Sequence, residues 1–252
     1  MQKNQNQELS KGFLVVASNT RKFYSLGLNL IETIRDYYPE AKVCFVTEKH
    51  FCDGRETIAD IVMHCGSWDR EKLWAIANTP FDITMYIDAD CEVQHEDIKT
   101  AFDHIKDHDM VFTALTKERE YCFAIREWKG GEFTLCGGVV LYNNTNPLVK
   151  DFMNDWYTLH KKQGEGEWWP LDENGEFDYE NHPSHLRKWD QFSLWWLVNH
   201  EPKYKDLNIG IFDDDARWNY FSSYKERKQH VKKPPIIFHW SAGVNKNGFN
   251  YD

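Results

Sequence analysis

The sequence has no apolar run long enough to cross a bilayer, and its polar first ten residues lack the charged-then-apolar layout of a signal peptide. It also lacks an excess of basic residues: 30 Lys and Arg stand against 40 Asp and Glu, for a formal net charge of -10. Proteins that bind nucleic acids need a basic face for the phosphates, so this charge balance argues against that class. We therefore expect a cytoplasmic protein with no integral membrane segment and no nucleic-acid partner.

Cysteine pairs at the spacing of metal sites are missing too. None of the six cysteines forms a CxxC pair, which argues against a structural zinc site. A chain of 252 residues is large enough to build a hydrophobic core without disulfides. We expect all six cysteines to be reduced and most of them to lie in the core.

The sequence does contain a regular alternation of strand and helix patterns up to about residue 90. Short apolar runs predict strands at 12–18, 42–47, 61–65 and 83–90. Apolar residues at helical spacing predict helices at 26–38 and 70–78. Such alternation is typical of a parallel sheet covered by helices. We predict an α/β fold, with residues 1–11 as a disordered leader and 12–252 as a single domain.

The second half of the chain is less regular. Its apolar patterns predict helices at 97–108, 147–160 and 189–199, and strands at 110–115, 134–142, 209–212 and 235–240. A loop rich in Gly, Trp and acidic residues is expected at 164–183.

The most informative stretch is 83–90, an apolar strand that ends in Asp88 and Asp90. Side chains alternate along a strand, so the two carboxylates are expected on one face and Ala89 on the other. Ligands of open α/β sheets gather beyond such strand ends. Two neighbouring carboxylates repel unless a cation lies between them, and Mg²⁺ or Mn²⁺ accepts carboxylate oxygens while leaving positions for phosphate oxygens. We favour a metal site here over a surface loop or a helix cap.

Further residues suited to a nucleotide and a sugar follow in order along the chain. They are the loop after the first strand (Ala17, Ser18, Asn19), Lys72 in the helix before the acidic strand, the pair Gly137-Gly138, the helix entrance Asp190-Gln191, and the late His239 with Lys246. In this order the elements resemble the nucleotide-sugar glycosyltransferases of the GT-A fold, most closely the glycogenin-like retaining branch. The resemblance covers roughly residues 12–248.

The resemblance implies a GT-A type single domain with a Rossmann-like, mostly parallel central sheet flanked by helices and a less regular C-terminal acceptor half. Residues 12–92 would form the nucleotide-binding half, and 93–252 the acceptor and metal-closing half. The implied activity is a metal-dependent transfer of a hexose, glucose or galactose, from a UDP-sugar with retention. The acceptor would be an unknown glycan, protein or small molecule.

The same resemblance implies a role for each residue. Asp88, Asp90 and His239 would ligate Mn²⁺ or Mg²⁺, and Asp190 with Gln191 would act at the reacting face of the sugar. The donor would contact the remaining residues, namely Ala17, Ser18, Asn19, Lys72, Asp88, Ala89, Gly137, Gly138 and Lys246.

Each role has a plainer alternative. His239 could be a hydrogen-bonded histidine at a strand end, Lys72 a surface lysine, and Asp190 the N-cap of its helix. The glycine pair marks either the close approach of a ligand or a β-bulge.

Lys246 also departs from the family's pattern. Gly243 follows His239 by four residues rather than three, and Asn247-Gly248 stands where the family has Pro-Trp. The register of Lys246 toward a diphosphate therefore stays open.

Two other functions compete with glycosyl transfer. A nucleotidyltransferase also pairs acids with Mg²⁺, but it would carry a glycine in the loop after the first strand, and residues 18–22 contain none. A non-catalytic carbohydrate-binding module could use aromatic side chains. Trp168 and Trp169 could stack on an acceptor sugar, whereas Trp195 and Trp196 are expected in the core.

Overall fold

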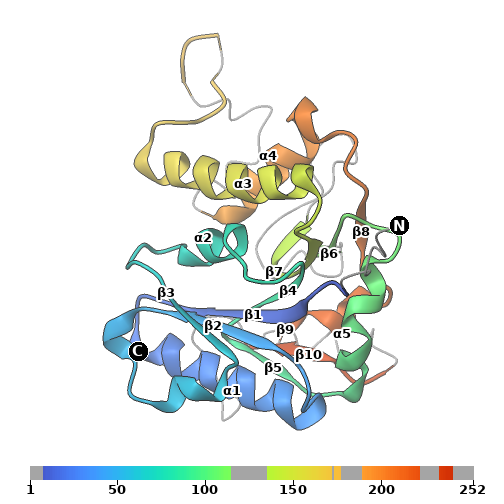
Figure 1. Ribbon diagram of the computed structural model, residues 1–252. Coiled ribbons are helices and arrows are strands. Elements are labelled where there is room, and N and C mark those ends of the chain that lie inside the picture. The colour runs from blue at the N-terminus through green and yellow to red at the C-terminus, as the bar shows by residue number, and fades with distance from the viewer. Residues whose placement is uncertain (1–7, 115–134, 172, 177–188, 222–232, 241–252) are drawn as a thin grey trace, which may run out of the picture.

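In the computed structural model, residues 8–114, 135–171, 173–176, 189–221 and 233–240 are described (Figure 1). The α-helices are α1 (Arg21–Tyr37), α2 (Glu71–Ala77), α3 (Pro147–Glu165), α4 (Asp190–Asn199) and α5 (Asp215–Trp218). Short 3₁₀ helices cover Lys49–Phe51, Arg55–Ile58, Glu96–Ile105 and Pro202–Tyr204. The strands are β1 (Lys11–Ala17), β2 (Val43–Thr47), β3 (Ile61–His64), β4 (Ile83–Asp88), β5 (Cys91–Val93), β6 (Met110–Ala114), β7 (Leu135–Asn143), β8 (Ile209–Ile211), β9 (Tyr220–Phe221) and β10 (Ile237–His239).

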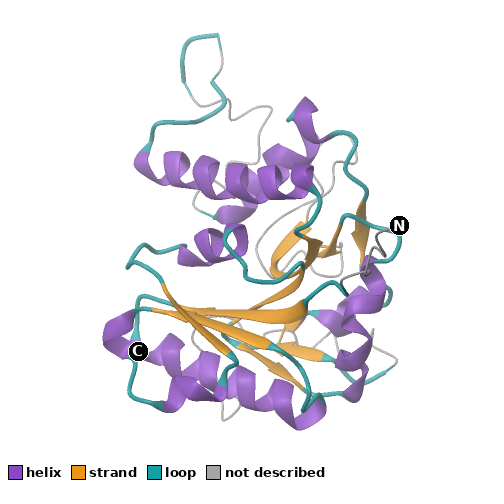
Figure 2. Ribbon diagram, viewed as in Figure 1, coloured by secondary structure: helices purple, strands orange, loops and turns teal. Residues whose placement is uncertain are grey.

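A seven-stranded sheet in the order β3-β2-β1-β4-β7-β6-β8 forms the centre of the fold. β7 runs antiparallel to both of its neighbours, and the other pairs in this sheet are parallel. A second, three-stranded sheet has the order β5-β10-β9. The expected α/β fold with a mostly parallel central sheet flanked by helices is therefore confirmed (Figure 2).

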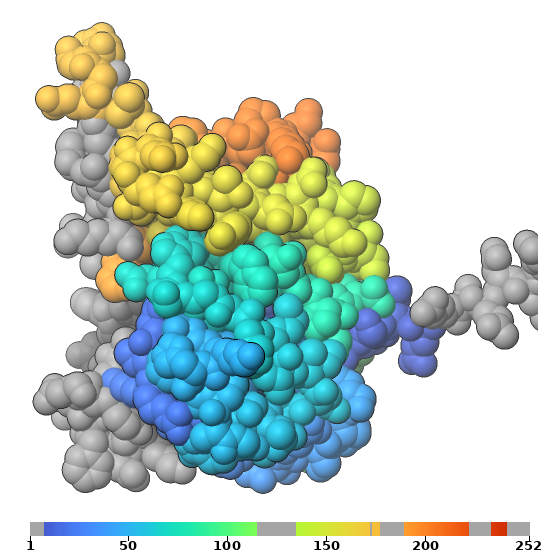
Figure 3. Space-filling view, turned by 60° about the vertical axis from the view of Figure 1, so that its left-hand side comes forward, coloured from blue at the N-terminus to red at the C-terminus, as the bar shows by residue number. Residues whose placement is uncertain are grey.

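Helices cover both faces of the large sheet, and each face has its own core (Figure 1). The alternation of side chains along β1 shows the division: Phe13 and Val15 join the core beneath α1, while Leu14 and Val16 join the core beneath α2, α3 and α4. In the space-filling view, yellow and orange residues of the second half lie at the top, above the teal and blue residues of the first half (Figure 3).

Helix ends follow from capping groups that the apolar pattern does not reveal. α1 begins at Arg21, five residues before the expected start, because the Thr20 side chain caps it by accepting the Phe23 N–H at 3.2 Å. α3 begins at Pro147 as expected, but it continues to Glu165, where Gly166 closes it in the left-handed conformation at φ 75°.

Two predicted elements are corrected. The strand expected at 83–90 ends at Asp88, and β5 belongs to the other sheet, because the chain turns at Ala89-Asp90 and the Trp240 N–H binds the Asp90 carbonyl at 2.9 Å. The helix expected at 97–108 is a 3₁₀ helix over Glu96–Ile105. α5 and β9 were not expected at all.

At the amino end, β1 starts at Lys11, and the Ser10 side chain and N–H both donate to Asp82, so residues 10 and 11, which the sequence assigned to the leader, belong to the fold. The cysteines within the described residues are free thiols, as expected. Within the same residues, no helix is both long enough and apolar enough to cross a membrane.

Candidate active site

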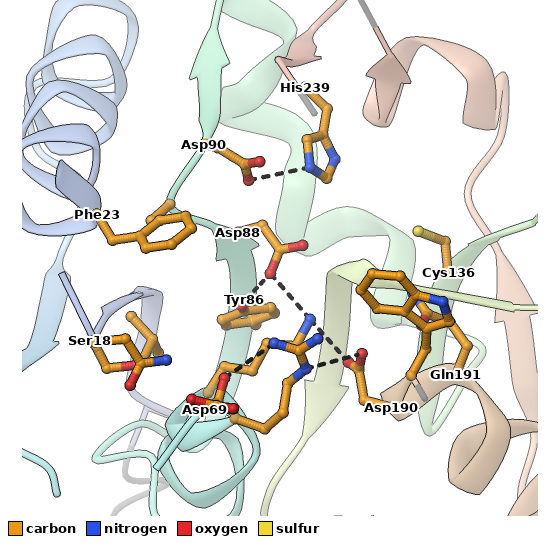
Figure 4. A pocket seen from close by; sticks show the side chains of 16 residues that line it. Ser18, Phe23, Asp69, Tyr86, Asp88, Asp90, Cys136, Asp190, Gln191 and His239 are labelled. Carbon is orange, nitrogen blue, oxygen red and sulfur yellow. Dashed lines mark hydrogen bonds and ion pairs between the residues drawn. The ribbon is translucent and has the colours of Figure 1, made fainter. Parts of the chain in front are cut away.

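A pocket of about 230 Å³ lies where β1 and β4 end, at the boundary between the first half of the sheet and β7 (Figure 4). The strand order reverses direction between β1 and β4, and such a reversal is the usual ligand position in open α/β folds. Most of the predicted site residues line this pocket: Ser18, Asn19, Lys72, Asp88, Ala89, Asp90, Asp190, Gln191 and His239.

The turn after β1 brings the first of these residues to the pocket. Asn19 adopts the left-handed conformation at φ 73°, which asparagine tolerates better than most residues. Its backbone N–H donates to the buried Glu48 carboxylate at 2.6 Å. The loop is thereby fixed against β2, with Ser18 at the pocket wall.

Lys72 joins two carboxylates at the centre of the pocket. Its Nζ lies 2.9 Å from Asp190 Oδ2 and 3.3 Å from Asp88 Oδ1, and its side chain is only 17% exposed. Burial lowers the pKa of Lys72, but the two carboxylates outweigh burial and raise that pKa above its usual value. The surface-lysine alternative is wrong, since Lys72 is a buried, charged ion-pair partner.

Asp190 and Asp88 respond differently to their surroundings. For Asp190, burial is outweighed by Lys72 and by Arg70, whose Nε lies 3.7 Å from Oδ1, and the pKa of the carboxyl falls. For Asp88, burial outweighs Lys72 and His239 and raises the pKa, although the Tyr86 hydroxyl donates to this carboxylate. The ionised form of Asp190 is thus stabilised, whereas burial disfavours the ionised form of Asp88.

The alternative that Asp190 caps its helix is wrong. α4 begins at Asp190 itself, and Trp189 occupies the N-cap position without a side-chain hydrogen bond. An acid in the first turn still benefits from the helix dipole. The carboxylate is nevertheless turned away toward Lys72, which leaves it available to the pocket.

His239 is held from both ring nitrogens. Nε2 lies 3.1 Å from Asp90 Oδ1, and Nδ1 lies 2.9 Å from Asn219 Oδ1 (Figure 4 shows the Asp90 contact). Asn219 uses its amide nitrogen on Thr113 Oγ1 at 3.0 Å and on the Cys136 sulfur at 3.2 Å, so its oxygen must accept from the histidine. The proton therefore stays on Nδ1, and Nε2 is the nitrogen that can bind a cation.

The charge of His239 depends on Asp90. Burial lowers the pKa of the imidazole, but the Asp90 carboxylate outweighs burial and raises it above its usual value. Asp90 in turn has a lowered pKa, because His239 outweighs its burial. Both shifts favour an imidazolium facing a carboxylate, and a divalent cation would replace the Nε2 proton.

Gly138 keeps space open between the acidic strand and the histidine. A Cβ at this position would lie 2.9 Å from Asp88 Oδ2 and 3.2 Å from His239 Cε1. The β6–β7 pairing also shifts register here, from Phe112–Val140 to Thr113–Cys136, so the glycine pair does form a bulge. The bulge alternative is confirmed, the close neighbours of the pair are protein side chains, and the approach of a ligand stays a prediction.

Among the described residues, three predicted ones are absent from the pocket lining: Ala17, Gly137 and Gly138. Ala17 is 1% exposed and packs in the core beneath α1. A Cβ on Gly137 would meet Trp156 at 3.0 Å and Asp190 Oδ2 at 3.5 Å, so Gly137 supports the pocket from behind. Lys246 lies outside the described residues. Ala89 lines the pocket beside both aspartates, because strand alternation stops at Asp88.

The sequence did not reveal several residues of the site. Arg70 and Trp189 line the pocket and contact each other, with the guanidinium carbon 5.7 Å from the indole centroid. Their signal was weak: a basic residue two positions before Lys72, and a Trp before Asp190. Asn219 carried no signal, since its partners lie 20 to 106 residues away in the chain.

Of the two tryptophans expected in the core, Trp195 is buried there and Trp196 is only half-buried. Trp195 is 2% exposed and belongs to the core. Trp168 and Trp169 are half-buried and pack against Phe192 of α4, with ring centroids 6.0 and 5.7 Å away. Trp196 is half-buried and meets Trp168 edge-on at 5.3 Å.

Comparison with solved structures places the fold among glycosyltransferases. Galactosyltransferase LgtC, solved with donor and acceptor sugar analogues, matches with a TM-score of 0.55 and 9% identity, over 93% of this chain and 88% of LgtC. The glycosyltransferase GlyE of Streptococcus pneumoniae TIGR4 matches with a TM-score of 0.59 and 14% identity, over 96% of this chain and 57% of GlyE. The bifunctional glycosyltransferase WbbM matches with a TM-score of 0.58 and 11% identity, over 98% of this chain and 49% of WbbM.

This chain therefore spans a little over half of GlyE and about half of WbbM. No protein-family model matches the sequence, and no curated protein matches it either. At these low identities the likeness concerns the fold, and the expected GT-A fold is confirmed.

Proposed function

We propose that the protein is a metal-dependent glycosyltransferase that moves a hexose, glucose or galactose, from a UDP-sugar to an acceptor with retention. The observation that carries the proposal is the pocket at the ends of β1 and β4, where Asp88, Asp90 and His239 converge beside the Lys72–Asp190 pair. The GT-A fold supports the same reaction class by analogy.

The donor groups of the pocket fit a divalent cation. Three largely buried carboxylates, Asp88, Asp90 and Asp190, face only two permanent cations, Lys72 and Arg70. Asp69, a fourth and exposed carboxylate, lines the same pocket. A divalent cation in place of a proton on His239 would add one positive charge to the pocket, and added positive charge favours a nucleoside diphosphate.

The residues that would hold the cation are Asp90 through Oδ1 and His239 through Nε2, with Asp88 beside them. Gly138 leaves the space between Asp88 and His239 free of a Cβ. When bound, the cation would neutralise the charge that develops on the leaving diphosphate as a Lewis acid.

The chain's own residues would orient the donor. Lys72 is charged and fixed by two ion pairs, so it can offer hydrogen bonds to phosphate or sugar oxygens without the entropic loss of ordering a free side chain. Gln191 is 6% exposed at the pocket, and its Oε1 has no hydrogen-bond partner in the described chain. A sugar hydroxyl would satisfy this oxygen.

The state of Asp190 favours retention over inversion. An inverting enzyme needs a general base that takes a proton from the acceptor hydroxyl. Asp190 is neutralised by Lys72 and Arg70, and its pKa is lowered, which makes it a weak base. We assign it instead to the orientation of the sugar and to stabilisation of positive charge at the anomeric carbon.

A panel of UDP-sugars tests the proposal. The purified protein is incubated with each donor and Mn²⁺, and UDP release is measured with water or a mixture of simple sugars as acceptor. We expect release from UDP-glucose or UDP-galactose, its loss with EDTA, and its loss in Asp190→Asn. The exposed Asp213→Asn serves as the matched control and should keep full activity.

The stereochemistry is read from the same reaction by NMR of the anomeric proton of the product. A product with the donor's configuration supports retention, and an inverted product would contradict the role given to Asp190. Absence of UDP release from every donor, together with metal-independent binding of glycans, would instead support a carbohydrate-binding module.

A further inference from the structure

The thiol of Cys91 lies beside the Asp90 carboxylate and the His239 imidazole. The glycosyl transfer proposed above gives this thiol no role. Cys91 is the first residue of β5, and it pairs directly with His239 of β10 in the antiparallel ladder. Residues opposite each other in such a ladder project from the same face, with Cβ atoms about 4.5–5.5 Å apart. The thiol and the imidazole are therefore neighbours by backbone register.

Asp90 completes the group. It precedes Cys91 in the chain, and its carbonyl accepts the Trp240 N–H at 2.9 Å, which locks the turn against β10. One ligand atom from each of Asp90, Cys91 and His239 lies within 4.8 Å of the others. Among the described residues, these three side chains form the group of potential ligands close enough together to hold a metal ion. Cys91 and His239 are 1% and 4% exposed.

Asp88, the third ligand that the sequence led us to expect, is not part of this cluster. Its Oδ1 contacts Lys72 Nζ and the Tyr86 hydroxyl, and its Oδ2 faces the space beside Gly138 and His239. The three groups that stand closest together are thus one oxygen, one sulfur and one nitrogen donor, rather than two oxygens and one nitrogen.

We propose that Cys91 ligates the metal together with Asp90 and His239, and that this donor set makes the centre select Zn²⁺ over Mn²⁺ when no nucleotide is bound. The inference rests on the metal site of the proposed function, although it does not depend on the identity of the donor sugar. Thiolate favours zinc and other borderline or soft ions, whereas carboxylate and water suit Mn²⁺ and Mg²⁺.

The distances between the three ligand atoms are close to those of a zinc site. Zinc bonds of about 2.0–2.3 Å place tetrahedral ligand atoms roughly 3.3–3.6 Å apart. Asp90 Oδ1 and His239 Nε2 already lie 3.1 Å apart, and the distances from the thiol to them, at most 4.8 Å, would have to shorten by no more than about 1.5 Å. Three protein ligands with a fourth position open to a pocket describe a catalytic rather than a structural zinc site.

Ligation changes protons but not oxidation states. The S–H bond of Cys91 breaks, a sulfur–metal bond forms, and the proton leaves to solvent together with the proton of His239 Nε2. Zinc is not redox-active, so no oxidant or reductant is required.

Cobalt spectroscopy tests the proposal without any sugar donor. Co²⁺ is added to the reduced, metal-free protein, and the near-ultraviolet spectrum is recorded. We expect a sulfur-to-cobalt charge-transfer band at one equivalent, its loss in Cys91→Ser, and its retention in Cys52→Ser and Cys65→Ser. Cys52 and Cys65 are half-buried free thiols outside the pocket lining, so they control for other thiols.

Calorimetry gives the selectivity. Wild-type protein should bind Zn²⁺ more tightly than Mn²⁺, and Cys91→Ser should lose Zn²⁺ affinity by more than about tenfold while its Mn²⁺ affinity changes little. Cys91→Ala, with circular dichroism of both variants, controls for folding, and the wild-type spectrum alone already decides whether a thiolate is bound.

The two proposals fail in different ways. Cobalt bound without a charge-transfer band, with Mn²⁺-dependent UDP release intact, overturns the role of Cys91 and leaves the glycosyltransferase proposal standing. A band that persists in Cys91→Ser assigns the thiolate to another cysteine and also overturns the inference. A band lost in Cys91→Ser, with no UDP release from any donor, supports the metal centre and refutes glycosyl transfer.

Discussion

Replacing Lys72 with methionine tests whether the pocket depends on a buried cation. Methionine keeps most of the length of the side chain and removes its charge, which leaves Asp190 and Asp88 facing each other across the pocket. Removal of one partner from a buried ion pair costs roughly 3–5 kcal/mol. Arg70 still contacts Asp190, and the Tyr86 hydroxyl still donates to Asp88, so we expect the lower end, about 3 kcal/mol.

The assay is urea unfolding followed by tryptophan fluorescence at several pH values. A loss of about 3 kcal/mol corresponds to a drop in Tm of roughly 6–12 °C for a protein of this size. The loss should shrink as pH falls from 7 to 4. Asp190 has a lowered pKa in the folded wild-type protein, so its ion pair keeps stabilising the wild type down to the unfolded pKa of about 3.9 and is lost only below it; the change between pH 7 and pH 4 comes from the variant. Removing Lys72 raises the pKa of both carboxyls, and protonation then relieves their repulsion.

Lys42→Met is the matched control. Lys42 pairs with Asp60 at a similar distance, 3.0 Å, but its side chain is 66% exposed. Such a surface pair contributes about 0–1 kcal/mol. The account of a buried ion-pair centre would be refuted if Lys72→Met lowered the free energy of unfolding no more than Lys42→Met does. It would also be refuted if the loss in Lys72→Met were equal at pH 7 and pH 4.

Three further variants test other parts of the structure. Gly138→Ala should weaken metal-dependent UDP binding at least about tenfold, because the added Cβ would press on Asp88. Gly164→Ala should leave the affinity unchanged, because no atom lies near its Cβ position, and calorimetry compares the two variants. Asn219→Ala should weaken Mn²⁺ binding about 10–100-fold, since His239 loses the acceptor that holds its Nδ1 proton, and an unchanged affinity by electron paramagnetic resonance would contradict this. Burial of Asp60 is outweighed by the Val43 N–H and two cations, which lowers its pKa to about 2. Asp60→Asn should therefore cost about 1 kcal/mol at pH 7, after allowance for its exposure, and less near pH 3, as measured by chemical unfolding; an equal cost at both pH values would count against that reasoning.

The parts of the fold that the sequence predicts are those governed by local patterns. The apolar runs of β1 and β4 specify buried strands because each run alone determines which faces are covered. Asp88, Lys72 and Asp190 could be found for the same reason, since each stands at the end or on the face of a strongly patterned element. Their meeting at one point follows from parallel topology.

The parts that the sequence does not predict depend on contacts between distant segments. The turn at Ala89-Asp90 exists because β5 pairs with β10, about 145 residues later, and a strand of three residues has too few positions to show a period. Asn219 and Cys91 matter through the partners that this pairing brings to them. Their roles could be read only after the small sheet had been built.

The central claim is that this pocket binds a UDP group through a divalent cation held by Asp90 and His239. Calorimetric titration of UDP into the protein with Mn²⁺, with EDTA, and into Asp90→Ala with Mn²⁺ tests that claim most directly. The account predicts binding only in the first of the three titrations. Equal binding in all three, or no binding in any, would contradict it.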